Sequence, residues 1–259
     1  LRIIDTEWDL EAYPRGMENA HQTDIAKQAC GGDWLFYLQA DEVVHEKYLP
    51  VIERRCRELL DDEEVEGLLF DYRHFWGDYE HVHRSHGWYR REIRIIRNRP
   101  DIHSWESAQS FRVIPDFDGV DYRRREGTRK LRVAHSGAEI YHYGWVRPPR
   151  LMQSKAKALA TIHKGEAGAA EEHDERAARF DYGDLSRIPR FRGTHPAVMK
   201  EVIEAFDWGD RLRHGGGPPE GRPRFKHEQL RYRLLSWIEN HLPGRPEIGG
   251  FRNYELLDR

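Results

Sequence analysis

Apolar residues near the start of the chain switch between the spacing of strands and the spacing of helices. Leu1–Asp5 reads as a short strand, and Gln22–Cys30 places apolar residues four apart, which is typical of a helix with one buried face. Trp34–Leu38 is a compact apolar run that predicts a buried strand, and Leu49–Leu60 returns to helical spacing. This order predicts an α/β unit with parallel strands, in which ligands bind beyond the carboxyl ends of the strands.

The middle of the chain has the alternating pattern of sheet strands, and the end has helical patterns. Gly67–Trp76 alternates apolar and polar side chains, and Ile93–Arg97 gives another strand, so we expect a mixed sheet. Pro148–Pro149 marks a break, after which apolar stripes predict helices. The stripes run over Met152–His163, Val198–Phe206 and Leu230–Ile238. We therefore predict an α/β core in residues 1–147 and a helical extension in residues 148–259.

Composition narrows the class of protein. The 259 residues are 38% hydrophobic and 34% charged, which is enough apolar material for one large core beneath a highly charged surface. A formal net charge of -3 argues against a general nucleic-acid binder, because such proteins carry a basic excess. Cys30 and Cys56 lie at apolar positions of helical patterns, which predicts buried thiols in a reducing compartment. No apolar run is long enough to span a bilayer, and we expect a cytoplasmic protein.

Two neighbouring acids, Asp41 and Glu42, follow the predicted strand Trp34–Leu38. A helix N-terminus also favours acids for electrostatic reasons, so the pair alone has a purely structural explanation. The stretch Gly32–Glu42, GDWLFYLQADE, closely resembles the segment of family 2 glycosyltransferases in which a buried strand leads into an Asp-Ala-Asp-Glu form of the DxD motif. The resemblance covers about the first 145 residues. It implies a GT-A-like mixed sheet that lacks the N-terminal nucleotide-binding strands.

The resemblance implies roles for residues on the donor side of the site. Asp41 matches the last Asp of the motif and would bind a divalent metal, Mn²⁺ or Mg²⁺, together with the donor diphosphate. Gln39 replaces the first Asp and would hydrogen-bond the donor as a neutral group. Gln22 and Asp24 lie in the helix that faces the nucleotide in this family, although polar residues are favoured at helix starts anyway.

A histidine later in the chain is the predicted second metal ligand. In Ile140–Trp145, His142 lies among aromatic residues, and this segment resembles the late element of GT-A enzymes in which a His completes the metal site. Imidazole is an acceptable ligand for Mn²⁺. The chain has 15 histidines, so a structural role for any one of them is the competing interpretation. His135 is the reserve candidate.

Glu106 is the predicted catalytic base. It lies in a segment, His103–Gln109, that resembles the acceptor side of the superfamily, and an inverting transfer needs a base to remove the acceptor proton. Asp71 and Glu92 are the alternatives. The assignment is geometric, because the metal, the leaving group and the attacking hydroxyl have to meet in one cleft. Glu106 should therefore stand near the metal ligands, separated from them by the space of a sugar ring.

The sequence thus predicts a metal-dependent, inverting transfer of a sugar from a nucleotide-diphospho-sugar donor. The acceptor is a glycan, a lipid-linked molecule or a protein, and peripheral membrane association is left open. No earlier strand–helix units precede Leu1, so we expect either a fragment of a longer enzyme or a degenerate product. A noncatalytic metal- or glycan-binding remnant of the same fold is the alternative function. A metallohydrolase is a third interpretation, but no His-Glu-x-x-His or comparable ligand spacing occurs.

Overall fold

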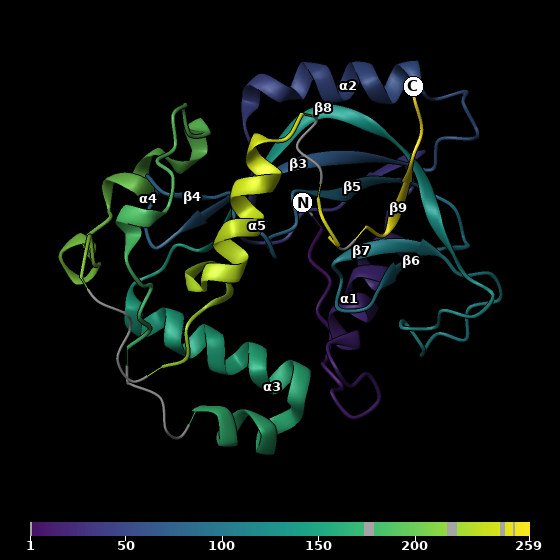
Figure 1. Ribbon diagram of the computed structural model, residues 1–259. Coiled ribbons are helices and arrows are strands. Elements are labelled where there is room, and N and C mark those ends of the chain that lie inside the picture. The colour runs from purple at the N-terminus through teal and green to yellow at the C-terminus, as the bar shows by residue number, and fades with distance from the viewer. Residues whose placement is uncertain (1, 174–178, 217–221, 244–246, 251) are drawn as a thin grey trace.

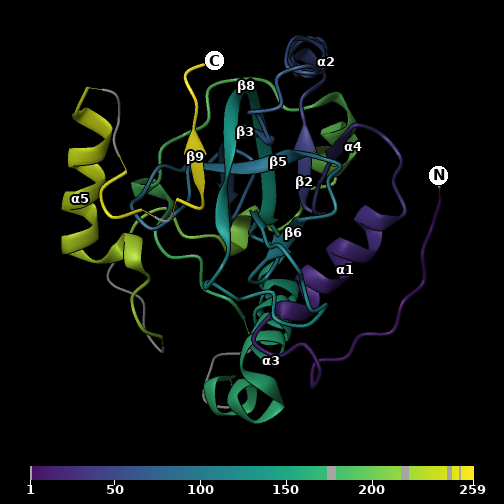
Figure 2. The same ribbon diagram turned by 90° about the vertical axis from the view of Figure 1, so that its right-hand side faces the viewer.

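The computed structural model describes residues 2–173, 179–216, 222–243, 247–250 and 252–259. The strands are β1 (Trp34–Phe36), β2 (Glu42–Val44), β3 (Gly67–Trp76), β4 (Val82–His83), β5 (Arg91–Arg97), β6 (Ile102–Trp105), β7 (Ser110–Val113), β8 (Arg129–Trp145) and β9 (Tyr254–Leu256). The helices are α1 (Met17–Gln28), α2 (Leu49–Glu58), α3 (Pro149–His173), α4 (Lys200–Glu204) and α5 (Leu230–His241). The helices surround one curled sheet of mixed direction (Figures 1 and 2), which confirms the predicted mixed α/β class.

The centre of the sheet is a parallel pair of long strands, β3 and β8. The main order of strands is β1-β5-β3-β8-β7-β6, with β2 and β9 also paired to β8 and β4 paired to β3. In the central pair, Gly67 lies opposite Val133 and His74 lies opposite His142. Because the two strands run in the same direction, His74 and His142 lie together near their carboxyl ends, where α/β proteins bind ligands.

The start of the chain differs from its prediction. Arg2–Asp5 is not a strand, and the side chains of Ile3 and Ile4 are exposed; Leu1 lies outside the described residues. Strand β1 pairs antiparallel with β5, so the predicted parallel strand–helix–strand unit is wrong. The reason is that β1 takes its hydrogen bonds from β5, a partner more than 50 residues further along the chain. The loop expected after β1 is also shorter, because Glu42–Val44 already forms β2 against β8.

One apolar core extends across the predicted boundary between residues 147 and 148. Phe75 of β3 and Tyr143 of β8 belong to the same buried cluster as Met152 of α3 and Tyr182. The chain then returns to the sheet at its end, where β9 lies parallel to β8 with Tyr254 opposite Leu131. The two predicted domains therefore share both a core and a sheet, and their boundary stays a prediction.

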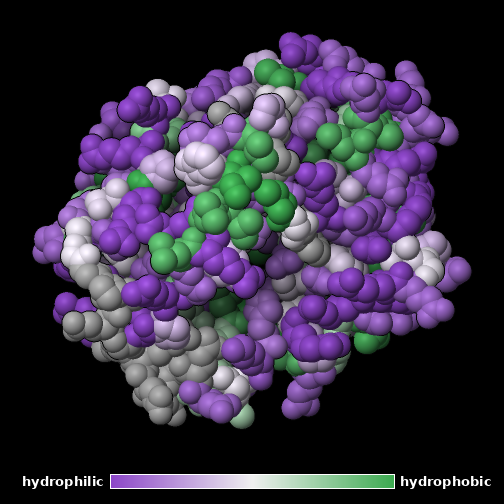
Figure 3. All heavy atoms as spheres, viewed as in Figure 1, coloured by the Kyte–Doolittle hydropathy of each residue, from purple (hydrophilic) through white to green (hydrophobic). Residues whose placement is uncertain are grey.

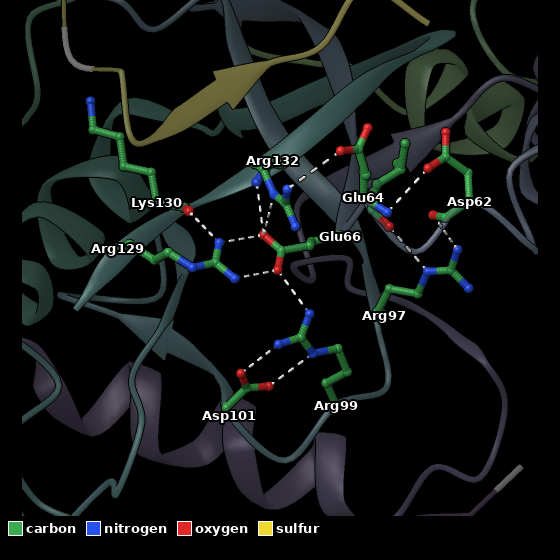
Figure 4. Close-up of polar contacts among 10 residues, drawn as sticks. Asp62, Glu64, Glu66, Arg97, Arg99, Asp101, Arg129, Lys130 and Arg132 are labelled. Carbon is green, nitrogen blue, oxygen red and sulfur yellow. Dashed lines mark hydrogen bonds and ion pairs between the residues drawn. The ribbon is translucent and has the colours of Figure 1, made fainter. Parts of the chain in front are cut away.

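A buried carboxylate links β3 and β8 at the end of the sheet that lies opposite to the two histidines (Figure 4). Glu66 lies just before β3, and its side chain is 0% exposed. Its oxygens accept hydrogen bonds from both terminal nitrogens of Arg129 at 2.6 Å, from Arg99 Nη1 at 2.8 Å and from the Arg132 N–H at 3.0 Å. Burial alone would raise the pKa of Glu66, but the hydrogen bonds from Arg129 and Arg132 outweigh it and the pKa is lowered. The amino ends of β3 and β8 are thus held together by charge-assisted bonds.

Several helices bury different faces from those predicted. The buried side chains of α1 include Met17, Ala20 and Asp24, whereas Cys30 beyond its end is exposed, which corrects the prediction of a buried thiol. Helix α4 is short, and Val202 on it is exposed. No helix within the described ranges is both long enough and apolar enough to cross a membrane.

Candidate functional site

Asp41 lies in the turn between β1 and β2, and the backbone fixes its position. Its carbonyl oxygen accepts a hydrogen bond of 2.8 Å from the N–H of Tyr143. The next residue, Glu42, lies opposite His142 across β2 and β8. Asp41 is therefore attached to the carboxyl end of β8, close to where that strand carries its histidine.

The carboxylate of Asp41 contacts a lysine and a histidine. Lys155 of α3 donates from Nζ to Asp41 Oδ2 at 2.7 Å and to the carbonyl of Gly144 at 2.8 Å. Nε2 of His142 lies 3.7 Å from Asp41 Oδ1. Burial alone would raise the pKa of Asp41, but the electrostatic interactions with His142 and Lys155, together with the hydrogen bond from Lys155, outweigh burial and lower the pKa. Asp41 is thus an ionised carboxylate that is only 22% exposed.

A chain of hydrogen bonds behind His142 determines which of its ring nitrogens carries the proton. His74 Nε2 lies 2.8 Å from the carbonyl oxygen of Tyr89, which only accepts, so His74 donates from Nε2. Burial lowers the pKa of both His74 and His142, so both rings are neutral at pH 7. His74 Nδ1 then accepts from His142 Nδ1 at 2.9 Å. The lone pair of His142 therefore lies on Nε2, the nitrogen nearest Asp41.

This arrangement fits a divalent cation. Imidazole ligands in metal sites typically donate their second nitrogen to a fixed partner, and His74 is that partner for His142. Two ligands in adjacent positions about 2.1 Å from one ion lie about 3 Å apart, so the 3.7 Å between Asp41 and His142 requires a small side-chain movement. Lys155, whose Nζ lies 2.7 Å from Asp41 Oδ2, would also have to move away. Among the described residues no three His, Cys, Asp or Glu side chains are grouped around a metal position. Asp41 and His142 would be a two-ligand set that leaves positions for substrate phosphates.

Gly144 provides the space between these groups. A Cβ atom at this position would lie 2.5 Å from His142 Nε2 and 2.6 Å from Asp41 Oδ2. Both distances are shorter than van der Waals contact, so any larger residue would push the two side chains apart. The requirement for glycine here arises from the close approach of the His142 and Asp41 side chains to the backbone.

Glu42 has a structural role next to Asp41. Arg94 donates from Nε to Oε2 at 2.9 Å and from Nη2 to Oε1 at 2.8 Å, and the hydroxyl of Tyr72 donates to Oε1 at 2.8 Å. The side chains of Glu42 and Arg94 are 0% and 1% exposed. The two neighbouring acids therefore have different environments, and the carboxylate of Glu42 accepts hydrogen bonds from Arg94, Tyr72 and the Gln39 N–H.

The predicted donor-binding residues have other partners in the fold. Gln39 Nε2 donates to the carbonyl of Ala108 at 3.3 Å, so this side chain links the Asp41 turn to the connection between β6 and β7. Asp24 accepts from His103 Nδ1 at 2.6 Å and thereby fastens α1 to β6. Gln22 donates to Glu18 of the same helix at 2.6 Å. Contact of Gln22, Asp24 and Gln39 with a donor stays a prediction.

Glu106 lies in a strained turn between β6 and β7. Glu106 and Ala108 have φ angles of 56° and 57°, a left-handed conformation that is uncommon for residues other than glycine. The carboxylate of Glu106 lies 3.3 Å from Arg125 Nη2, and Arg123 is also within ion-pair distance. The turn approaches the Asp41 loop through the contact between Ala108 and Gln39. The role of Glu106 as a base stays a prediction.

Glu92, one of the two alternatives to Glu106, is a buried carboxyl group on β5. Its Oε2 atom has no hydrogen-bond partner among the described residues. Burial raises the pKa of Glu92 to about 8, with a further increase from the charge of Glu42 and a decrease from Arg94. Glu92 also lines a cavity of about 330 Å³ together with Tyr89 and Gln109. A carboxyl group with a raised pKa beside a cavity has the properties of a general acid or base.

Replacing Glu92 by Gln is expected to reduce the pH dependence of stability. A carboxyl group whose pKa rises on folding from 4.5 to about 8 stabilises the protein fully below pH 4.5, and this contribution is lost as the pH rises through about 8. The loss is on the order of 1.4 kcal/mol per pH unit across that window. Urea unfolding at about pH 5 and about pH 8 measures it. The exposed control is Glu64→Gln. If the free energy of unfolding changes equally with pH in the wild type, Glu92→Gln and Glu64→Gln, then Glu92 is ionised in the folded protein.

Sequence reasoning missed two residues of the site and proposed one that lies elsewhere. His74 and Lys155 were not predicted, although a histidine between the apolar residues of a buried strand is a signal that deserves a functional interpretation. His135 lies seven residues before His142 on β8, which corresponds to roughly 20 Å along a strand. It is therefore far from Asp41. Asp71, the other alternative base, pairs with Arg91 at 2.9 Å.

No protein-family model and no curated protein matches this sequence.

Proposed function

We propose that the protein is a glycosyltransferase that moves a sugar from a nucleotide-diphospho-sugar donor to an acceptor, with inversion and with help from a divalent metal ion. The observation that carries this proposal is the pair formed by Asp41 and His142. An ionised carboxylate and the lone pair of a neutral imidazole lie 3.7 Å apart at the carboxyl end of a central strand. That is the ligand type and the position that a diphosphate-binding metal site needs.

Each side chain has a specific task in this proposal. Asp41 and His142 would hold Mn²⁺ or Mg²⁺, which neutralises the negative charge of a leaving diphosphate. Gln39 would offer its amide to the donor, and Gln22 and Asp24 would approach the nucleotide from α1. Glu106 would remove the proton from the acceptor hydroxyl. Glu92 is the second candidate for this task, supported by its raised pKa and by the cavity beside it.

A specific observation supports the noncatalytic alternative as well. The ammonium group of Lys155 already neutralises Asp41, at a distance of 2.7 Å. A protein that only binds a glycan, and no longer binds metal, could keep its fold with this ion pair in place. Metal binding therefore distinguishes the two proposals, because a catalytic site has to exchange the lysine for a divalent cation at the carboxylate.

Partners and compartment follow from the same proposal. The acceptor would be a glycan, a lipid-linked molecule or a protein, and the free thiols of Cys30 and Cys56 are consistent with the cytoplasm. The GT-A identity of the sheet belongs to this proposal too. It rests on the resemblance of Gly32–Glu42 to the DxD segment of family 2 glycosyltransferases.

Thermal unfolding with a panel of nucleoside diphosphates and Mn²⁺ tests the proposed function. A nucleotide at about a hundredfold excess over its Kd is expected to stabilise the protein by about 2.7 kcal/mol, which raises Tm by a few degrees. His142→Ala should remove this increase, whereas His135→Ala on the same strand should retain it. The sugar donor of a nucleotide that raises Tm is then incubated with the protein. Release of nucleoside diphosphate from this donor would show that the protein is an enzyme and not only a binding protein. Identical behaviour of the two histidine variants would argue against a metal at His142.

A further inference from the structure

Helix α5 carries an apolar stripe that the rest of the described chain leaves uncovered. Leu230, Leu234 and Trp237 are 76%, 60% and 59% exposed. At 3.6 residues per turn these three side chains fall within about 60° of each other around the helix. Figure 3 shows apolar side chains gathered along α5, surrounded by hydrophilic residues. Isolated exposed apolar residues are common, but an aligned stripe with a tryptophan indicates a surface that contacts something else.

Basic side chains border the stripe on both sides. Arg231 and Arg233 are exposed and lie next to Leu230 and Leu234 around the helix. Arg224 is exposed in the segment that leads into α5. Among the described residues no carboxylate lies within ion-pair distance of Arg224 or Arg233. Within the described part of the chain, the stripe is therefore framed by positive charge that no ion pair neutralises at Arg224 or Arg233.

A basic cavity opens beside the same helix. Its volume is about 450 Å³, and Leu230, Arg233 and Trp237 form part of its wall. Four more arginines also line the cavity: Arg84, Arg187, Arg213 and Arg224. Its two acids are already paired, Asp184 with Arg187 at 3.0 Å and Glu228 with Arg222 at 2.7 Å. Arg213 is paired as well, with Asp181 at 3.3 Å. The apolar stripe and the arginine-lined cavity thus share residues and belong to one surface.

We propose that this surface of α5 binds an anionic lipid bilayer, with Leu230, Leu234 and Trp237 entering the interfacial region and the arginines contacting lipid phosphates. Guanidinium groups match phosphate oxygens in geometry and charge, and tryptophan prefers the boundary between head groups and acyl chains. A helix with an apolar stripe and a basic border is the usual element that lies in a membrane interface. The basic border complements the negative surface charge of an anionic bilayer. This inference goes beyond the proposed sugar transfer and does not depend on it.

Vesicle sedimentation tests the proposal with the full chain. We expect the protein to sediment with phosphatidylcholine vesicles that contain about one-third phosphatidylglycerol, and to stay in solution with pure phosphatidylcholine. Arg224→Gln with Arg233→Gln should lower partitioning about 25-fold, since each basic residue near the surface contributes about fivefold. Leu234→Ser with Trp237→Ser should lower it roughly tenfold or more. Binding should weaken between roughly 50 mM and 500 mM NaCl.

Matched variants on other surfaces serve as controls. Arg54→Gln with Arg57→Gln changes the net charge equally on α2, which lies on a different side of the molecule (Figure 2), and Val198→Ser with Val202→Ser removes exposed apolar groups near α4. These variants should bind vesicles as the wild type does, and circular dichroism verifies that all variants are folded. Equal binding to neutral vesicles, or equal losses in the controls, would overturn the proposal. Binding of inorganic phosphate to the protein without any binding to vesicles would also overturn the proposal. So would a dimer in solution that the α5 variants abolish.

Discussion

Replacing Asp41 by Asn is expected to weaken Mn²⁺ binding by about a hundredfold or more while the protein remains folded. Loss of a residue that only supports a metal ligand already costs roughly 10- to 100-fold in affinity, and Asp41 would be a ligand itself. The change removes the charge that attracts the cation and retains the size of the side chain. Lys155 keeps its hydrogen bond to the Gly144 carbonyl, so stability should fall by about 1 to 3 kcal/mol, the contribution of one hydrogen bond to a charged group. Calorimetric titration with Mn²⁺ alone measures the affinity.

The control for this experiment is Asp61→Asn, which neutralises an exposed carboxylate near the end of α2. It should bind Mn²⁺ as the wild type does. Unchanged Mn²⁺ affinity in Asp41→Asn would remove Asp41 from the site, and with it the proposed metal-dependent transfer. Using Mn²⁺ without nucleotide keeps the result independent of which donor the protein prefers.

Replacing the next residue, Glu42, by Gln is expected to have the opposite pattern, with lower stability and retained metal affinity. Removing one partner of a buried ion pair leaves the other charge without compensation, which costs about 3 to 5 kcal/mol. Arg94 is 1% exposed and would be left in that state. Urea unfolding at neutral pH measures the loss, and Mn²⁺ titration below the unfolding transition measures the affinity.

Acid provides a second test of Glu42. Burial alone would raise the pKa of Glu42, but the charge and hydrogen bonds of Arg94 outweigh it and the pKa is lowered. The contribution of Glu42 to stability is therefore present above the pKa of the unfolded chain, near 4.5, and is lost as the pH falls through the lower folded value. Glu42→Gln should lack this loss. Unchanged stability together with lost Mn²⁺ binding would mean that Glu42, and not Asp41, is the ligand.

The sequence predicted some long elements well because their patterns repeat many times, but it gave no strand for Arg129–Trp145, which is β8. Gly67–Trp76 begins and ends as expected, since ten residues of strand pattern define β3. Helices α2 and α5 also lie within or close to their predicted ranges. Short elements such as β1 and β2, with three residues each, contain too few positions for a pattern to fix their partners. Their direction depends on hydrogen bonds to strands far along the chain.

The site was predictable only where a motif marks it. The segment Gly32–Glu42 pointed to Asp41, and the aromatic segment pointed to His142, but nothing local indicates that Lys155 reaches back across 114 residues to Asp41. The difference between Asp41 and Glu42 was also hidden. It arises from Arg94 on β5, which the fold brings to Glu42 and not to Asp41. Such pairings depend on tertiary contacts, which the periodicity of the chain does not encode.

The pairing of β8 has a consequence for how quickly the protein folds. Strand β8 lies beside β3, more than 60 residues earlier, and beside β9, more than 120 residues later. Closing such long loops costs entropy before any contact compensates for it, so proteins dominated by distant pairings fold slowly. During synthesis on the ribosome, residues 131–133 have no strand partner on this edge of the sheet until Tyr254–Leu256 has been made. Until then an unpaired strand edge is exposed, and a chaperone that shields it would increase the yield of native protein.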